Sequence, residues 1–174
     1  TRLEQTLLSR ESLVRCSLAG ALDEIIHRRG VESLPLIDKL LSDASMDVIR
    51  IATSSLRLTT NLDSEGFATR CARLVHLGDS GISRQFAQTT LRDYMVMYPD
   101  DRKGLTVQLW IEGDEVVRSR LRELLLHMLD DYSAQLSNIL TRISQMDGDN
   151  SLEDFWRILE VRSTETAEAW RNHI

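Results

Sequence analysis

The chain has 174 residues, of which 42% are hydrophobic, so it is long enough and apolar enough to bury a core of its own. Its formal net charge of −6 falls entirely on residues 79–174, because residues 1–78 carry equal numbers of basic and acidic side chains. This balance argues against a general nucleic-acid binder, which needs a basic face to displace counterions. The apolar runs are far shorter than a bilayer-spanning helix, and the first residues lack the layout of a signal peptide.

The two cysteines, Cys16 and Cys71, lie within apolar helical patterns and are predicted to be reduced thiols of the core. Neither belongs to a CxxC motif or has a histidine at the spacing of a metal ligand. We therefore expect a cytoplasmic chain without membrane insertion.

Apolar residues recur at intervals of three and four along the chain, which is the period of an amphipathic helix. With two prolines and eight glycines, few positions interrupt these helices. In chain order, breaks are predicted at Gly30, 61–63, 77–81, 98–104, 112–114 and 146–150. The sequence therefore predicts an all-α fold of about nine or ten helices of ordinary length.

Four segments of similar sequence align on an arginine: SLVRCSLAGAL, DVIRIATSSL, GISRQFAQTTL and EVVRSRLRELL. The arginines are Arg15, Arg50, Arg84 and Arg118, and the spacings between them are 35, 34 and 34 residues. A leucine follows each arginine after six or seven residues: Leu22, Leu56, Leu91 and Leu125. An aliphatic residue precedes each arginine by two: Leu13, Val48, Ile82 and Val116. Four copies in register indicate a structural repeat, in which these arginines are structural residues.

Each copy is predicted to be the second helix of a hairpin, because a first helix ends in apolar residues upstream of it. These apolar pairs are Leu7/Leu8, Leu40/Leu41, Leu74/Val75 and Leu109/Trp110. The turns carry Ser45, Ser80 and Asp114 as predicted N-cap residues. A hairpin that is apolar on the faces it turns to its neighbours cannot close a core alone, so we expect the hairpins to stack.

The segments DASMDVIRIATSSL, DSGISRQFAQTTL and GDEVVRSRLRELL, with a weaker first copy SRESLVRCSLAGAL, resemble the HEAT-repeat family of α-solenoids. The resemblance covers residues 1–130 and implies four HEAT-like hairpins wound into a right-handed α-α superhelix. It also implies that turn aspartates pair with repeat arginines and tie successive repeats together. The candidate pairs join Asp43 or Asp47, Asp79 and Asp114 to Arg50, Arg84 and Arg118. Another helix-hairpin solenoid and a non-repetitive bundle are the alternative folds.

Residues 131–174 depart from the repeat and are predicted to form divergent capping helices that belong to the same continuous domain. Amphipathic helices are expected over DYSAQLSNILTRISQ, SLEDFWRILEVR and STETAEAWRNHI, with Ser151 as the N-cap of the second. The alternative is a partner-binding element with Phe155, Trp156 and Trp170 as its anchors, because aromatic side chains are enriched at the energetic centres of interfaces.

No GxSxG nucleophile motif, glycine-rich phosphate loop or HExxH motif occurs, and no histidine is followed by glutamate. We therefore predict a non-enzymatic chain without a metal site or a cofactor. One enzymatic alternative is a HEAT-like alkylpurine DNA glycosylase or related nucleic-acid-binding domain. Membership of that group, of which no motif is evident in the sequence, would imply an aspartate with aromatic residues beside a basic groove. The candidates are Asp93 with Tyr94, and Trp110 near Arg118, Arg120 and Arg122.

The preferred function is the binding of a protein partner, as a scaffold or adaptor within a larger assembly or regulator. Positions one, four and eight after the repeat arginines become more polar in the third and fourth copies. Because buried columns should be apolar, we expect one outward ridge that contacts the partner: Gln85, Gln88, Arg92, Ser119 and Arg122. A scaffold that only self-associates is a further alternative, and the sequence leaves the oligomeric state open.

Overall fold

The computed structural model describes residues 6, 9–129, 131–148 and 152–162. Every regular element among them is a helix, and this part of the chain contains no strand, so the prediction of an all-α fold is confirmed. The chain divides into two compact units, Thr1–Tyr94 and Met95–Ile174, and each is described by itself. None of the described helices has the length and apolar character that a membrane span requires. Ser151 and the segment STETAEAWRNHI lie outside the described residues.

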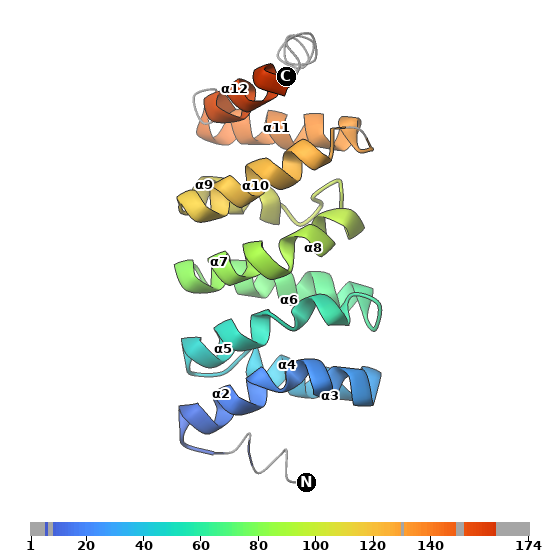
Figure 1. The fold of residues 1–174 in the computed structure, drawn as a ribbon, viewed down its shortest axis with the longest axis vertical. Coiled ribbons are helices and arrows are strands. Elements are labelled where there is room, and N and C mark those ends of the chain that lie inside the picture. Colours follow the sequence, from blue (N-terminus) through green and yellow to red (C-terminus); the bar gives the residue numbers. More distant parts are fainter. Residues whose placement is uncertain (1–5, 7–8, 130, 149–151, 163–174) are drawn as a thin grey trace. The chain divides into compact units, whose positions relative to one another are not determined.

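The first unit consists of short helices joined by tight turns (Figure 1). They are α2 (Ser12–Gly20), α3 (Leu22–Arg29), the 3-10 helix η1 (Gly30–Ser33), α4 (Leu34–Leu40), α5 (Met46–Thr53), the 3-10 helix η2 (Leu56–Thr59), α6 (Ser64–His76), α7 (Ser80–Thr89) and the start of α8 (Leu91–Met97). The breaks predicted at Gly30, 61–63 and 77–81 coincide with helix boundaries. At Gly30 the backbone φ is 55°, a left-handed value that glycine adopts without a Cβ clash.

The second unit contains the end of α8 followed by four helices of 8 to 15 residues (Figure 1). They are α9 (Leu105–Glu112), α10 (Glu115–His127), α11 (Ser133–Asp147) and α12 (Glu153–Arg162). The breaks predicted at 98–104, 112–114 and 146–150 separate these helices, and α11 and α12 match the first two helices predicted for the tail. Helix α9 packs against both α10 and α11.

Aspartates cap three of the helices that the sequence pattern predicts. Asp63 accepts a hydrogen bond from Gly66 N at 3.0 Å and caps α6. Asp114 caps α10 as predicted, with Val117 N as its donor. The prediction of Ser80 as a cap was wrong, because Ser80 is already the first helical residue of α7 and the preceding Asp79 is the cap. A carboxylate at this position also interacts favourably with the helix dipole.

The turn before α5 is organised differently. Ser45 occupies the N-cap position, but its side chain makes no capping hydrogen bond. Instead, the backbone N–H of Ser45 donates to Asp43 Oδ1 at 2.8 Å, so the aspartate two residues before the N-cap position fixes the turn.

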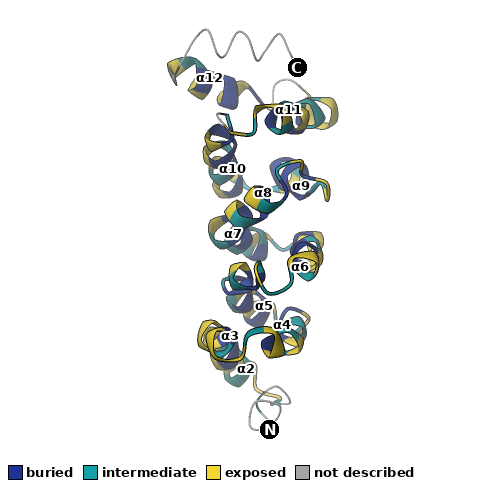
Figure 2. Cartoon of the chain, turned by 90° about the vertical axis from the view of Figure 1, so that its right-hand side faces the viewer, coloured by how far each residue is buried: buried dark blue, intermediate teal, exposed yellow. Residues whose placement is uncertain are grey.

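Helix α5 is the centre of the first unit, because it packs against both α2 and α7 (Figure 1). Helix α4 packs on α5, and α6 packs on α7, so these helices form successive hairpins. Figure 2 shows in dark blue that the buried positions of α5 and α7 lie on the sides covered by neighbouring helices. The unit therefore buries its apolar surface between hairpins as well as within them.

The leucine column of the repeat is buried throughout. The side chains concerned, Leu22, Leu56, Leu91 and Leu125, each have 0% of their surface exposed. The described apolar pairs at the ends of the first helices, Leu40/Leu41, Leu74/Val75 and Leu109/Trp110, are at most 2% exposed. These columns confirm that the periodicity read from the sequence marks core positions.

The second aliphatic column is buried in only half of its members. Val48 on α5 and Ile82 on α7 are fully buried, whereas Leu13 on α2 is 78% exposed and Val116 on α10 is 45% exposed. In α10 the adjacent Val117 takes the inward position. On α2, no helix of the described chain covers the side that carries Leu13. The first and fourth copies thus deviate from the central two.

The second helix of each hairpin in the first unit is broken at an equivalent place. The breaks lie at Ala21, between α2 and α3, at Ser54–Ser55, between α5 and η2, and at Thr90, between α7 and α8. The periodicity did not predict these breaks, because the apolar pattern continues across them. Each break directly precedes a buried leucine of the column, and the residues after the first break, in α3, pack against η2 of the next hairpin.

Side-chain hydroxyls form hydrogen bonds beside two of these breaks. Thr53 Oγ1 donates to Ile49 O at 2.8 Å and Thr89 Oγ1 donates to Gln85 O at 2.8 Å, a pattern that bends helices. Thr90 Oγ1 also donates to Thr53 O at 3.3 Å, which joins the break after α7 to the break after α5. The Thr53 and Thr89 hydroxyls therefore favour a bend at these places, and the Thr90 hydroxyl connects neighbouring hairpins.

We expect Leu56→Ala to lower the free energy of unfolding by about 2–5 kcal/mol, because it leaves a cavity between hairpins. Leu13→Ala is the matched control, and its effect should stay within about 0.5 kcal/mol because Leu13 is exposed. Urea denaturation followed by circular dichroism measures both. Equal losses for the two variants would contradict the assignment of the leucine column to the core.

Candidate interaction surface

The predicted ridge falls into two parts, one in each unit. In the first unit, Gln88 and Arg92 are exposed on α7 and α8, and Gln85 is half-buried. In the second unit, Ser119 is exposed on α10. These placements agree with outward-facing positions, and partner binding at them stays a prediction.

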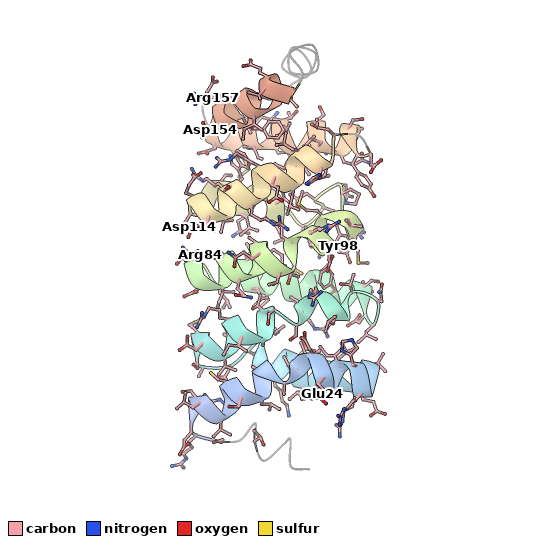
Figure 3. The ribbon with its side chains drawn as sticks, in the orientation of Figure 1. Glu24, Arg84, Tyr98, Asp114, Asp154 and Arg157 are labelled. Atoms are coloured by element: carbon pink, nitrogen blue, oxygen red, sulfur yellow. The ribbon has the colours of Figure 1, made fainter. Side chains whose placement is uncertain are left out.

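Arg122 differs from the other ridge residues because it is engaged within the second unit. Its side chain is 13% exposed, and its guanidinium donates a hydrogen bond to Glu115. Arg122 Nη1 also lies 3.6 Å from Asp154 Oδ2 on α12, and Asp154 in turn lies 4.0 Å from Arg157 Nη1 (Figure 3). Arg122 therefore ties α10 to α12, which gives it a structural role.

Trp156 is 7% exposed, and its ring packs edge-on against Phe155 with the centroids 5.2 Å apart. The pair fills the inner side of α12. This packing leaves little of the indole accessible to a partner, so the structure gives Trp156 a place in the core of the second unit.

Arg15 contacts an aspartate of the next hairpin through two hydrogen bonds. Its Nε lies 2.7 Å from Asp43 Oδ2 and its Nη2 lies 3.0 Å from Asp43 Oδ1, which is a bidentate pair. Arg15 Nη1 also donates to Ser9 O at 2.6 Å. Because Asp43 belongs to the turn before α5, this pair ties α2 to the next hairpin. The Arg15 hydrogen bonds hold the pKa of the Asp43 carboxyl below its ordinary value.

The other described repeat arginines make different contacts. Arg50 pairs at 3.0 Å with Asp47, one turn away on the same helix, and both side chains are at least half exposed. Arg118 Nη2 donates to Ile111 O at 3.0 Å. The structure therefore pairs Asp43 with the arginine of the preceding copy, where the resemblance offered it to Arg50. Arg84 is exposed on α7.

Arg70 on α6 is a second link between hairpins, and sequence analysis missed it. It is 6% exposed and donates to Asp38 Oδ1 at 2.8 Å and Asp38 Oδ2 at 3.1 Å. Its Nη1 donates to Asp63 Oδ2 at 3.0 Å. The backbone N–H of Gly66 and, next, Arg70 lower the pKa of the Asp63 carboxyl. A buried guanidinium with two carboxylates fixes α4 against α6.

Asp101 was missed as well, because the DD pair at 100–101 resembles an ordinary solvated turn. Asp101 is fully buried, has a φ of 47°, and accepts hydrogen bonds from Thr106 N at 3.0 Å and Val107 N at 3.3 Å. Arg142 on α11 donates to Asp101 O at 3.2 Å. Burial raises the pKa of the Asp101 carboxyl, against the backbone N–H groups, which lower it. Asp101 thus connects the start of α9 to α11.

The residues considered for a glycosylase-like site do not present accessible aromatic rings. Tyr94 has 0% and Trp110 has 1% of its surface exposed. Tyr94 contacts Phe86 with the ring centroids 6.5 Å apart, so it belongs to the core of the first unit. A ring that stacks on a nucleobase must be reachable, and these two rings are covered.

Among the described residues, no three His, Cys, Asp or Glu side chains lie close enough to hold a metal ion. Cys71 is fully buried, and burial raises the pKa of its thiol far above the ordinary value, so it is not a reactive thiolate.

The chain matches no protein-family model, no curated protein and no solved structure. The candidate surface is therefore defined by the geometry of the chain itself.

We expect Arg15→Ala to lower the urea midpoint of unfolding clearly, because it leaves the carboxylate of Asp43 without its bidentate partner. Arg50→Ala is the matched control and should leave the midpoint nearly unchanged, since an exposed pair within one helix contributes little. A larger loss in Arg50→Ala than in Arg15→Ala would contradict these roles.

A comparison of wild type with Arg15→Ala also gives a pH test. Because the pKa of Asp43 is depressed in the folded state, its contribution is present above the unfolded pKa and is lost as the pH falls through the folded pKa. Wild type should therefore lose more stability than Arg15→Ala between about pH 5 and about pH 3. Parallel pH profiles would show that Arg15 does not act on Asp43.

Proposed function

We propose that the chain is a non-enzymatic protein-interaction module built from HEAT-like helix hairpins, which stack into a right-handed α-solenoid as one domain of a larger assembly or regulator. The observation that supports this proposal is the position of α5 between α2 and α7 in the first unit. These three helices are the second helices of successive sequence copies. Stacking of equivalent helices is the arrangement by which helix-hairpin repeats bury their apolar faces.

The links between hairpins support the same proposal. Arg15 joins α2 to the turn before α5, and Arg70 joins α6 to α4. The first of these is an arginine–aspartate pair between successive copies, the kind of contact that a resemblance to HEAT repeats implies. Such links fix the hairpins at defined positions and leave the polar sides of the second helices free for recognition.

In the second unit, α11 and α12 serve in this proposal as the cap of the repeats. Helix α11 packs on α9, and Arg122 ties α12 to α10. Phe155 and Trp156 turn their rings inward. A cap is expected to cover an apolar face with helices whose outer side is polar, and the exposed Glu153, Asp154 and Arg157 fit that description, whereas Ile158 and Val161 of the same helix are exposed as well.

The alternative is a nucleic-acid-binding HEAT-like domain. The burial of Tyr94 and Trp110 speaks against it, as does the acidic net charge of −6. We also place the module in the cytoplasm on the basis of its two free cysteines, one of which is fully buried.

The proposal is tested by identifying what the full chain binds. Proteins captured from an extract by the immobilised chain are identified by mass spectrometry, purified and titrated against the chain by calorimetry. We expect saturable binding of one protein, together with no retention on heparin and no binding of duplex DNA. Binding of duplex DNA that weakens steeply with salt, or release of bases from alkylated DNA, would contradict the proposal.

A further inference from the structure

We propose that the first unit binds an acidic, extended segment of its protein partner through three side chains, Arg57 on η2, Gln88 on α7 and Arg92 on α8, which we name the arginine ridge. The inference rests on the proposed function and adds the chemistry of the partner. The arginine ridge leaves out Arg122 of the ridge predicted from the sequence, because Arg122 pairs with Glu115 and lies close to Asp154 within the second unit.

Counted from the buried leucines, the two arginines lie at equivalent positions, although Arg57 lies seven residues and Arg92 eight residues after its repeat arginine. Arg57 directly follows Leu56, and Arg92 directly follows Leu91. Both leucines are fully buried in the same column, so the next residue on each helix points to the same side of the stack. Arg57 and Arg92 are accordingly both exposed.

The helix breaks bring these positions near each other. The hydrogen bond from Thr90 Oγ1 to Thr53 O joins the two breaks, and α5 packs against α7. Arg92 lies two residues after Thr90, and Arg57 lies four residues after Thr53. Gln88 occupies the preceding turn, at the position equivalent to Ser54 in the copy before it. The ridge therefore crosses from one hairpin to the next.

The ridge arginines lack the carboxylate partners that five of the described arginines of this unit have. Arg15, Arg28, Arg50, Arg70 and Arg73 each lie within 4.0 Å of an aspartate or glutamate oxygen. Arg57 and Arg92 make no such pair with any described residue. Each guanidinium thus keeps its donors for a carboxylate supplied by another molecule.

The charge around the ridge favours a protein segment over a nucleic acid. Residues 1–94 carry equal numbers of basic and acidic side chains. Asp93 follows Arg92 directly, and Asp23 occupies the position equivalent to Arg57 in the preceding copy, where it accepts a hydrogen bond from Ser55. Two separate arginines with aspartates nearby are complementary to a peptide segment whose carboxylates are also separated. A phosphate backbone, in contrast, requires a continuous basic surface. The amide of Gln88 can bond the backbone of an extended segment.

The test uses the full chain and a fluorescent glutamate-rich peptide, with binding measured by fluorescence anisotropy at low ionic strength. We expect the double variant Arg57→Glu/Arg92→Glu to bind the peptide about tenfold or more weakly than wild type. The matched control is Arg29→Glu/Lys39→Glu, which makes the same charge change at exposed positions on α3 and α4. This control should keep most of the affinity, and thermal melting verifies that both variants are folded.

Three results would overturn the inference. They are absence of peptide binding by wild type, equal loss in the two double variants, and tighter binding of duplex DNA that depends on Arg57 and Arg92. The proposed function is judged separately, by the protein identified from the extract. If that protein binds the ridge variant as tightly as wild type, the acidic-segment inference fails while the interaction module stands.

Discussion

A single hairpin of this sequence cannot bury its own apolar faces, and the rest of the first unit follows from that constraint. Helix α5 has only 8 residues, and a helix of that length is marginal in water by itself. It is held because α2 and α7 cover it on two sides and because Leu56 is fully buried just beyond its end. Burial between hairpins, more than helix propensity, therefore determines which residues are helical and which side of each helix is free.

The polar contacts select one arrangement of these hairpins. Arg15 with Asp43, Arg70 with Asp38, and the Thr90 to Thr53 hydrogen bond each join residues far apart in sequence. Arg15 and Asp43 are largely shielded from water, so breaking that pair leaves an uncompensated carboxylate and penalises other registers. The Thr90 hydrogen bond joins two of the helix breaks, and Arg57 and Arg92 are exposed just after these breaks.

Much of the fold could be predicted from the sequence, since the predicted breaks and the leucine column depend only on local period and on glycine, proline and aspartate positions. The resemblance implied aspartate–arginine links but offered Asp43 to Arg50, whereas its partner is Arg15. The link between Asp38 and Arg70 could not be predicted, because these residues are 32 apart and nothing local marks them as partners. Asp101 was missed for a similar reason, as its burial depends on α11. Of the candidate site, Gln88, Arg92 and Ser119 were placed outward correctly, whereas the contacts of Arg122 and Trp156 depend on how α12 packs.

Coupling between hairpins is the central claim, and native-state hydrogen exchange of Leu56→Ala tests it most directly. If the hairpins stabilise one another, the substitution should lower amide protection in α2 and α7 as well as in α5, because α5 packs against both. Loss of protection confined to α5 and η2, with α2 and α7 unchanged, would contradict it.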